Sequence, residues 1–337
     1  MNALVLFAGA GGADIGLRAA GLDHLACVEG DAHACATLRA AGFPAVHAWI
    51  GDGPQPERVV RSKVQPPLPV WRHDGRSVDL LWASPPCQPY SSAGPCLGAD
   101  DPRDGWPATL DAIRDVRPRW VVIENVVGSP ADEWADALRL LYPEVMVWRS
   151  NAINWGLPSR RDRLYVVAGP RHWTPPAPTH CDPDAPWLIR ASRHPWKSFS
   201  EVIGTPHNPL WHPNADAFVV WSEWSVRSGN QVFDQKVPCL AITTKKVHCG
   251  PFGTYALLRK PQFAALGLIQ PPEERAAADE RYRGLRRTLT VEECAALCGF
   301  PSGYPFQGPK EKRYRQVGNC VAPIMAEVIG RAILEAA

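Results

Sequence analysis

The chain has 337 residues, of which 45% are apolar and 21% are charged, enough for one large globular domain and a smaller one. Its formal charge of +2 means that a polyanion would be bound by local basic stretches and not by the field of the whole molecule. Ten cysteines form no C-x-x-C pair and no His/Cys cluster at metal spacing, which predicts reduced thiols without a metal. Neither a signal peptide nor an apolar run near the roughly 20 residues of a membrane span is expected.

Short apolar runs alternate with helical stretches along the first half of the chain. The first run ends in glycines, and an Ala/Leu-rich helical stretch follows it to Ala20. Such alternation predicts an α/β fold, with a Rossmann-like, mostly parallel sheet that carries helices on both faces. The predicted strands are residues 3–8, 25–28, 78–82, 120–123, 145–148 and 164–168, and helices are expected at 131–141 and 322–335.

Two stretches interrupt this pattern. Residues 51–75 are rich in Pro and resemble a surface insertion, whereas residues 169–287, rich in Pro, Trp and His, are too long for a loop inside a compact domain. We therefore expect three parts. These are a catalytic and cofactor-binding domain over 1–169, a smaller domain of mixed structure over 170–312, and a C-terminal helix over 313–337 that returns to the first domain.

A glycine turn follows the first predicted strand, in the run Phe7-Ala8-Gly9-Ala10-Gly11-Gly12. Glycines at this point let the backbone bend tightly and approach a ligand closely. Glu29 ends the second predicted strand, where its carboxylate suits the two ribose hydroxyls of an adenosine. The pattern G-x-G-x-x-G is incomplete because Asp14 occupies its last position. We interpret the turn as a nucleotide-type cofactor site, with a plain structural turn as the alternative.

Cys87 lies in the run Ser84-Pro85-Pro86-Cys87-Gln88-Pro89, directly after a predicted strand. Open α/β sheets build their sites at the carboxyl ends of strands. Neighbouring Arg side chains and backbone donors can favour the thiolate, the form in which Cys attacks. The alternative is a small buried apolar residue, against which the flanking prolines argue.

Two further polar clusters stand beside predicted strands. Glu124-Asn125-Val126 closes an apolar strand, where a Glu could share a proton with a bound base. Arg161 and Arg163 precede the strand at 164–168 and could reach the same site. An ion-paired surface Glu and a solvated Arg face are the corresponding structural alternatives.

Together these runs are similar in order, spacing and identity to the motifs of the cytosine-5 DNA methyltransferase family. The glycine turn resembles its cofactor motif, Pro86-Cys87-Gln88 its nucleophile motif, Glu124-Asn125-Val126 its proton-donor motif and Arg161-x-Arg163 its third catalytic motif. Residues 289–301 and 315–321 resemble its last two motifs. Val5 stands where many members have Asp, and Ser159 where most have Gln, which leaves cofactor-loop bracing and small-domain positioning by those side chains in question.

The resemblance implies a DNA (cytosine-5-)-methyltransferase that uses S-adenosylmethionine and needs no metal. Residues 170–312 would be its target-recognition domain. The implied catalytic residues are Cys87, Glu124, Arg163, Asn125 and Arg161. The implied cofactor-binding residues are Phe7, Ala8, Gly9, Gly11, Gly12, Glu29, Gly30, Pro85, Asn319 and Val321, while the Asp that contacts the adenine is left open between Asp52 and Asp74.

The implied mechanism begins with attack of Cys87 on carbon 6 of cytosine. Glu124 would bond the ring nitrogen and exocyclic amine, with Arg163 on the base oxygen and Asn125 positioning the loop. The base must first be flipped out of double-stranded DNA, and residues 91–106, with Gly94, Gly98 and Gly105 as hinges, would close behind it. The expected DNA contacts are Gln88, Ser91, Arg103, Thr243, Thr244 and Lys245. Further phosphate contacts are expected among Lys246, Arg281, Arg283, Arg286, Arg287, Lys310, Lys312 and Arg313, with solvated surface as the alternative.

By analogy with compact members of the family, we expect a cytoplasmic, nucleoid-associated monomer of bacterial, archaeal or phage origin, with a cognate restriction endonuclease as partner. Three alternatives stay open. One is a tRNA cytosine-5 methyltransferase, although the Cys-Phe-Thr element of that branch is missing from the sequence. Another is a catalytically silent DNA-binding relative, although Cys87 and Glu124 are both retained. The third is transfer of a modified group from a relative of S-adenosylmethionine.

Overall fold

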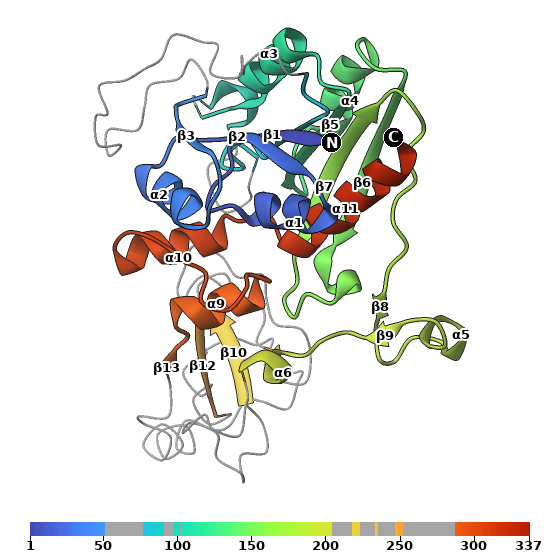
Figure 1. The fold of residues 1–337 in the computed structure, drawn as a ribbon. Helices are drawn as coiled ribbons and strands as arrows, with labels where there is room; N and C mark the ends of the chain where they lie inside the picture. The colour runs from blue at the N-terminus through green and yellow to red at the C-terminus, as the bar shows by residue number, and fades with distance from the viewer. Residues whose placement is uncertain are drawn as a thin grey trace.

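The computed structural model describes residues 1–50, 77–90, 97–101, 103–203, 218–222, 233–234, 247–251 and 287–337 (Figure 1). The expected alternation of strands and helices is present. The first part comprises β1 (Asn2–Leu6), α1 (Gly12–Ala20), β2 (Asp23–Glu29), α2 (Ala32–Ala40), β3 (Ala45–His47), β4 (Leu80–Ala83), η1 (Gly98–Asp100), α3 (Trp106–Val116), β5 (Trp120–Val126), α4 (Ala131–Arg139), β6 (Glu144–Asn151), η2 (Ala152–Trp155) and β7 (Asp162–Gly169).

These strands form one seven-stranded sheet in the order β3-β2-β1-β4-β5-β7-β6. Neighbouring strands from β3 to β5 are parallel, whereas β7 runs antiparallel to both β5 and β6. The mostly parallel sheet predicted from the sequence is thus confirmed. The short strand β3 was missed by the sequence analysis, because its three residues carry no long apolar run.

Two hydrophobic cores cover the two faces of the sheet. Alternate residues of one strand point to opposite faces, so Val5 joins the core that includes α1 and α11 (Pro323–Ala336), whereas Leu4 and Leu6 join the core that includes α3 and α4. Figure 1 shows α1 and α11 side by side, and their glycines let them approach closely: a Cβ on Gly16 would lie 2.1 Å from the backbone oxygen of Pro323. The predicted helices on both faces are confirmed.

The C-terminal region is apolar enough to resemble a membrane span. Residues 310–336 are long and apolar enough for a helix that could cross a bilayer. More than half of the most apolar part of this stretch is buried inside the protein. Asn319 ends α10 (Lys310–Gly318), and α11 begins at Pro323. Because Met325, Ile329 and Ile333 lie in the core beneath the sheet, packing accounts for the apolar face of α11.

The rest of the chain adds smaller elements below the sheet in Figure 1. A third hydrophobic core joins α6 (Phe199–Ile203) to Leu297 of α9 (Val291–Leu297) and to Tyr314 and Val317 of α10. The domain boundaries expected at residues 169 and 312 stay a prediction. The elements are β8 (His180–Cys181), α5 (Trp187–Arg190), β9 (His194–Pro195), α6 (Phe199–Ile203), β10 (Phe218–Ser222), β11 (Phe233–Asp234), β12 (Val247–Pro251), β13 (Arg287–Thr288) and α9 (Val291–Leu297), with β11-β10-β12-β13 forming a four-stranded sheet.

Candidate active site

The order of the sheet reverses between β1 and β4, and the candidate site lies at this switch point. Chain order runs outward in one direction through β2 and β3 and in the other through β4 and β5. The glycine turn after β1 therefore lies beside the Pro-Cys run after β4, and the Ser84 amide donates to the Leu6 carbonyl at 3.2 Å. Sheets of this class bind ligands at such a point, because the two connecting segments leave the sheet toward opposite faces.

The conformation of the glycine turn is determined by its own backbone dihedral angles and by a hydrogen bond to Glu29. Phe7 has a φ of 55°, and Gly9 and Gly11 have φ values of 57° and 91°, so the chain leaves β1 in a conformation that L side chains seldom adopt. The Glu29 carboxylate accepts from the Gly9 amide and from the Asp31 amide, each at 2.7 Å. A side chain on Gly9 would meet nothing within 4 Å, which leaves this side of the turn open to a ligand.

The C-terminal segments brace the other side of the turn. The Tyr304 hydroxyl donates to the Ala10 carbonyl at 2.6 Å. Gly12 approaches the backbone of Val321 so closely that a Cβ would lie 2.2 Å from the Val321 oxygen. Val321 thus lies at the turn, and its predicted cofactor contact stays a prediction, whereas Asn319 caps α10 and is exposed. Tyr304 was missed by sequence reasoning, because only the fold brings it to residue 10.

Cys87 lies half-buried in the loop after β4. Burial raises the pKa of its thiol, and the Arg163 guanidinium acts in the opposite direction. Gly105 packs beneath the same loop, since a Cβ there would lie 2.9 Å from Pro86 and 2.8 Å from Phe7. The loop therefore packs between the glycine turn and the start of α3.

Glu124 and Arg163 form an ion pair at the adjoining strand ends. Arg163 Nε lies 3.0 Å from Glu124 Oε1, and both side chains are mostly buried. This pairing follows from the register of β5 and β7, in which Val126 lies opposite Arg163 and Glu124 opposite Tyr165. The next residue, Asn125, is 2% exposed and donates from Nδ2 to the Pro85 carbonyl at 3.1 Å, which ties the Pro-Cys loop to β5.

Arg161 has a different environment from Arg163. It is buried, and its guanidinium donates to the Gly318 carbonyl at 3.1 Å and to the Cys320 carbonyl. Ser159, also buried, donates to the Leu297 carbonyl at 2.7 Å and so ties this segment to α9. These contacts give Arg161 a positioning geometry, in which it joins the segment before β7 to the chain between α10 and α11.

Only some of the residues predicted to contact DNA lie in the part of the chain that the structure describes. Arg103 makes a bidentate pair with Asp101, with N–O distances of 2.6 and 2.8 Å. Lys312 pairs with Asp31 at 3.1 Å, and Arg313 Nη1 lies 3.9 Å from a Glu292 oxygen. Gln88 lies beside Cys87 with a buried side-chain oxygen, and Lys310 lies 6.0 Å from the centre of the Tyr314 ring. Ser91, Gly94, Thr243, Thr244, Lys245, Lys246, Arg281, Arg283 and Arg286, the side chain of Arg287, and the open candidates Asp52 and Asp74 lie outside the described residues.

Two more features escaped the sequence analysis. The Trp49 ring packs on Gly30, where a Cβ would lie 2.9 Å from it, beside the predicted cofactor residues. Behind the glycine turn, Asp14, His24 and Cys27 bring three metal-type donor atoms together. The expectation of no metal was based on the spacing of Cys and His residues along the chain. Such spacing cannot reveal a cluster assembled from a helix and a strand.

A doubly wound sheet with polar groups gathered at its switch point is typical of α/β enzymes that bind a nucleotide-type ligand there. The sequence profile described as C-5 cytosine-specific DNA methylase matches residues 1–174 and 225–335. The chain therefore belongs to the C-5 cytosine-specific DNA methylase family, and its enzyme class is DNA (cytosine-5-)-methyltransferase.

Known proteins resemble the chain over nearly all of its length. It is 28% identical over 348 residues to the Type II methyltransferase M.NaeI of Lentzea aerocolonigenes, covering 99% of this chain and 74% of the relative. It is 27% identical over 356 residues to the Type II methyltransferase M.NgoMIV of Neisseria gonorrhoeae, covering 99% and 97%. The crystal structure of the S. pombe Dnmt2 methyltransferase shares the fold, with a TM-score of 0.62, 19% identity and coverage of 100% and 99%.

Proposed function

We propose that this chain methylates carbon 5 of a flipped-out cytosine in double-stranded DNA through a covalent adduct with Cys87, with S-adenosylmethionine as the methyl donor. The observation that carries the proposal is the convergence of three strand ends. The Cys87 thiol shares its electrostatic environment with Arg163 and Glu124, which form an ion pair 3.0 Å apart. A nucleophile, a carboxylate and a cation in one place suit an attack in which charge builds on a bound base.

The residues at the glycine turn suit S-adenosylmethionine. Its ribose hydroxyls could donate to Glu29, because each carboxylate oxygen has a further lone pair beyond the backbone amide that it already accepts. Gly9, Gly11 and Gly30 would allow close backbone approach, with Trp49 beside Gly30. When bound there, S-adenosylmethionine supplies an electrophilic methyl group.

Each catalytic side chain then has a distinct role. Cys87 would add to carbon 6 as a thiolate, which makes carbon 5 nucleophilic. Glu124 would bond the ring nitrogen and the exocyclic amine, and Arg163 would hold both the carboxylate and the base oxygen. Asn125 would keep the Cys87 loop in place through Pro85, and Arg161 would keep the arginine segment in place through Gly318 and Cys320. Loss of the carbon 5 proton and expulsion of Cys87 would complete the turnover.

The biological role that we propose is modification in a restriction–modification system, with a cognate endonuclease as partner. Both named relatives are Type II methyltransferases, and this chain aligns with them over 99% of its length. We expect the protein to act as a monomer in the cytoplasm of a bacterial-type cell. The target-recognition region over 170–312 and the DNA contacts at Gln88, Ser91, Arg103, Thr243, Thr244 and Lys245 belong to the same proposal.

The test is methyl transfer from radiolabelled S-adenosylmethionine to unmethylated DNA and, separately, to tRNA. We expect label in DNA cytosine with the native protein, no label with Cys87→Ala, and undiminished label with Cys181→Ala. The control removes a buried thiol on β8, whereas Cys87 is half-buried in the loop after β4. Label only in tRNA would favour the RNA enzyme, and DNA binding without label would favour the silent relative.

A second assay tests the adduct itself. DNA with 5-fluorocytosine at the target has no carbon 5 proton to lose, so the enzyme should stay attached after methyl transfer. We expect a band resistant to denaturation with the native protein and with Cys181→Ala. A band of equal intensity from Cys87→Ala would overturn the proposed nucleophile.

A further inference from the structure

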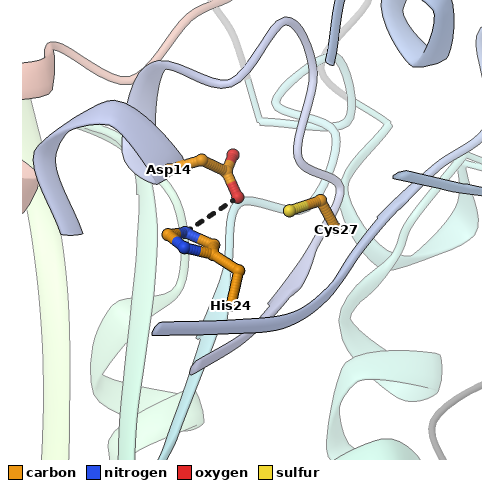
Figure 2. A group of neighbouring side chains, drawn as sticks. All are labelled: Asp14, His24 and Cys27. Carbon is orange, nitrogen blue, oxygen red and sulfur yellow. Dashed lines mark ion pairs between the residues drawn. The ribbon is translucent and has the colours of Figure 1, made fainter. Parts of the chain in front are cut away.

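Three side chains that the proposed mechanism does not use meet behind the glycine turn. Asp14 comes from the first turn of α1, and His24 and Cys27 come from β2 (Figure 2). His24 Nε2 lies 3.4 Å from Asp14 Oδ1, and the ligand atoms of all three residues lie within 4.8 Å of one another. Figure 2 shows the imidazole and the sulfur both directed at the carboxylate.

These polar groups are deeply buried, and their hydrogen bonds are few. Asp14 is 0% exposed, and the side chain of His24 is 4% exposed. Among the residues that the structure describes, Asp14 faces His24 Nε2 at 3.4 Å and the Cys27 thiol, and neither Asp14 oxygen nor His24 Nε2 forms a short hydrogen bond. Buried polar atoms are normally paired, because an unpaired one loses its hydration without replacement. A cation between the three side chains would satisfy all of these polar atoms at once.

We propose that Asp14, His24 and Cys27 bind a zinc ion. Thiolate, imidazole and carboxylate are the ligands that zinc takes in proteins, whereas Ca²⁺ and Mg²⁺ select oxygen alone. In a tetrahedral zinc site, neighbouring ligand atoms are separated by roughly 3.3–3.6 Å. The observed separation of 3.4 Å between His24 and Asp14 is in this range, and the upper limit of 4.8 Å needs only small side-chain movements.

Charge balance supports the same ion. A thiolate and a carboxylate carry two negative charges, and with a neutral imidazole they would neutralise a divalent cation inside the core. Three protein ligands leave one position of a tetrahedral site for a further ligand.

The position of the cluster indicates a structural role for the ion. Asp14 lies just after the glycine turn, and Cys27 lies just before Glu29, whose carboxylate holds the Gly9 amide. An ion shared by the two elements would link the first turn of α1 to β2 directly behind the cofactor turn. Zinc would thus act as a structural link that fixes the spacing between Gly9 and Glu29.

The experiment measures metal binding and needs neither DNA nor a methyl donor, so its outcome is independent of the proposed function. Protein prepared with excess zinc is dialysed and its metal content is measured by mass spectrometry. A second sample is loaded with Co²⁺, whose absorption reports a tetrahedral site and a thiolate ligand. We expect one retained ion per chain and a thiolate-to-cobalt band.

Variants locate the ion within the chain. Cys27→Ser should abolish the thiolate-to-cobalt band, and Asp14→Asn or His24→Gln should lower metal retention by about tenfold or more. Cys181→Ser, the same change at another buried cysteine, should leave both readouts unchanged. The native protein without a cobalt band, or a band that persists in Cys27→Ser, would overturn the proposal. If Cys27→Ser fails to fold, the same decision rests on the native band and on the lowered metal retention of His24→Gln.

Discussion

The Cys87 thiol is subject to two opposing influences. Burial raises its pKa, because the protein interior stabilises the thiolate less well than water does. The positive charge of Arg163 lowers it, and Arg163 is held in place by its ion pair with Glu124. The pKa of the Cys87 thiol therefore depends on a neighbour that comes from another strand.

The first prediction concerns the pH dependence of Cys87. A raised thiol pKa means that the thiolate fraction increases throughout the neutral range, by about tenfold per pH unit below the pKa. Alkylation of Cys87 by iodoacetamide, followed by peptide mass spectrometry, should accelerate accordingly. Arg163→Gln should slow it at every pH, whereas Arg149→Gln, at an exposed ion pair on β6, should not. A rate independent of pH would contradict the prediction.

The second prediction concerns Tyr304 beneath the glycine turn. Tyr304→Phe removes the hydroxyl that donates to the Ala10 carbonyl at 2.6 Å. We expect a stability loss of about 1 kcal/mol and a higher KM for S-adenosylmethionine, because the turn loses a brace. Tyr142→Phe removes an equivalent bond to the Pro118 carbonyl at 2.8 Å, away from the turn. That variant should lose similar stability in urea unfolding and keep its KM; equal KM values in both variants would refute the bracing role.

At the scale of secondary-structure elements, the contact between α1 and α11 holds the last motif against the cofactor turn. Leu17 of α1 and Ile329 of α11 are both fully buried in the same core. Gly12 and Gly16 allow the approach, since each would place a Cβ within 2.2 Å of a backbone oxygen of the C-terminal segment. Val321, which packs against Gly12, lies two residues before α11 begins, so we expect helix packing to influence the position of the glycine turn.

The third prediction follows from this packing. On helix propensity alone, Gly16→Ala would stabilise α1 by about 1 kcal/mol. The new Cβ would instead lie 2.1 Å from the Pro323 oxygen and 2.7 Å from the Glu327 amide nitrogen, so we expect a loss of about 1–3 kcal/mol. Ala19→Gly, at an exposed position of the same helix, should cost about 1 kcal/mol through propensity. Urea unfolding of the pair distinguishes the two causes, and a stabilised Gly16→Ala would disprove the close contact.

For the whole molecule, the charge distribution matters more than the net charge. The formal charge is only +2, and several basic side chains of the described residues are already paired with acids, including Arg103 with Asp101 and Lys312 with Asp31. DNA must therefore be attracted by local groups of Lys and Arg, in competition with these internal pairs.

The fourth prediction is a steep salt dependence of DNA binding. Each phosphate neutralised by Lys or Arg releases counterions, so the affinity should fall steadily as salt increases. Fluorescence anisotropy with a labelled duplex from low to moderate salt measures the slope. Asp101→Asn, which frees Arg103, should strengthen binding at low salt, and Asp136→Asn, at an exposed pair on α4, should change it less. Affinity that is constant across this range would show that phosphate contacts are not the main attraction.

The amino-acid sequence by itself determined the class of fold and the family. The strands at 120–123 and 164–168 and the C-terminal helix were predictable because apolar runs and helical periodicity are local properties of the chain. The motifs around Cys87, Glu124 and Arg163 were equally visible, because each is a short run of consecutive residues.

Only the tertiary structure decided which side chains meet. The antiparallel direction of β7 places Arg163 on Glu124, the fold brings Tyr304 to Ala10, and Arg161 reaches the carbonyls that precede α11. The cluster of Asp14, His24 and Cys27 joins a helix to a strand at no recognisable spacing. Such contacts depend on strand order and helix packing, which arise from the summed burial of many residues and not from any local pattern.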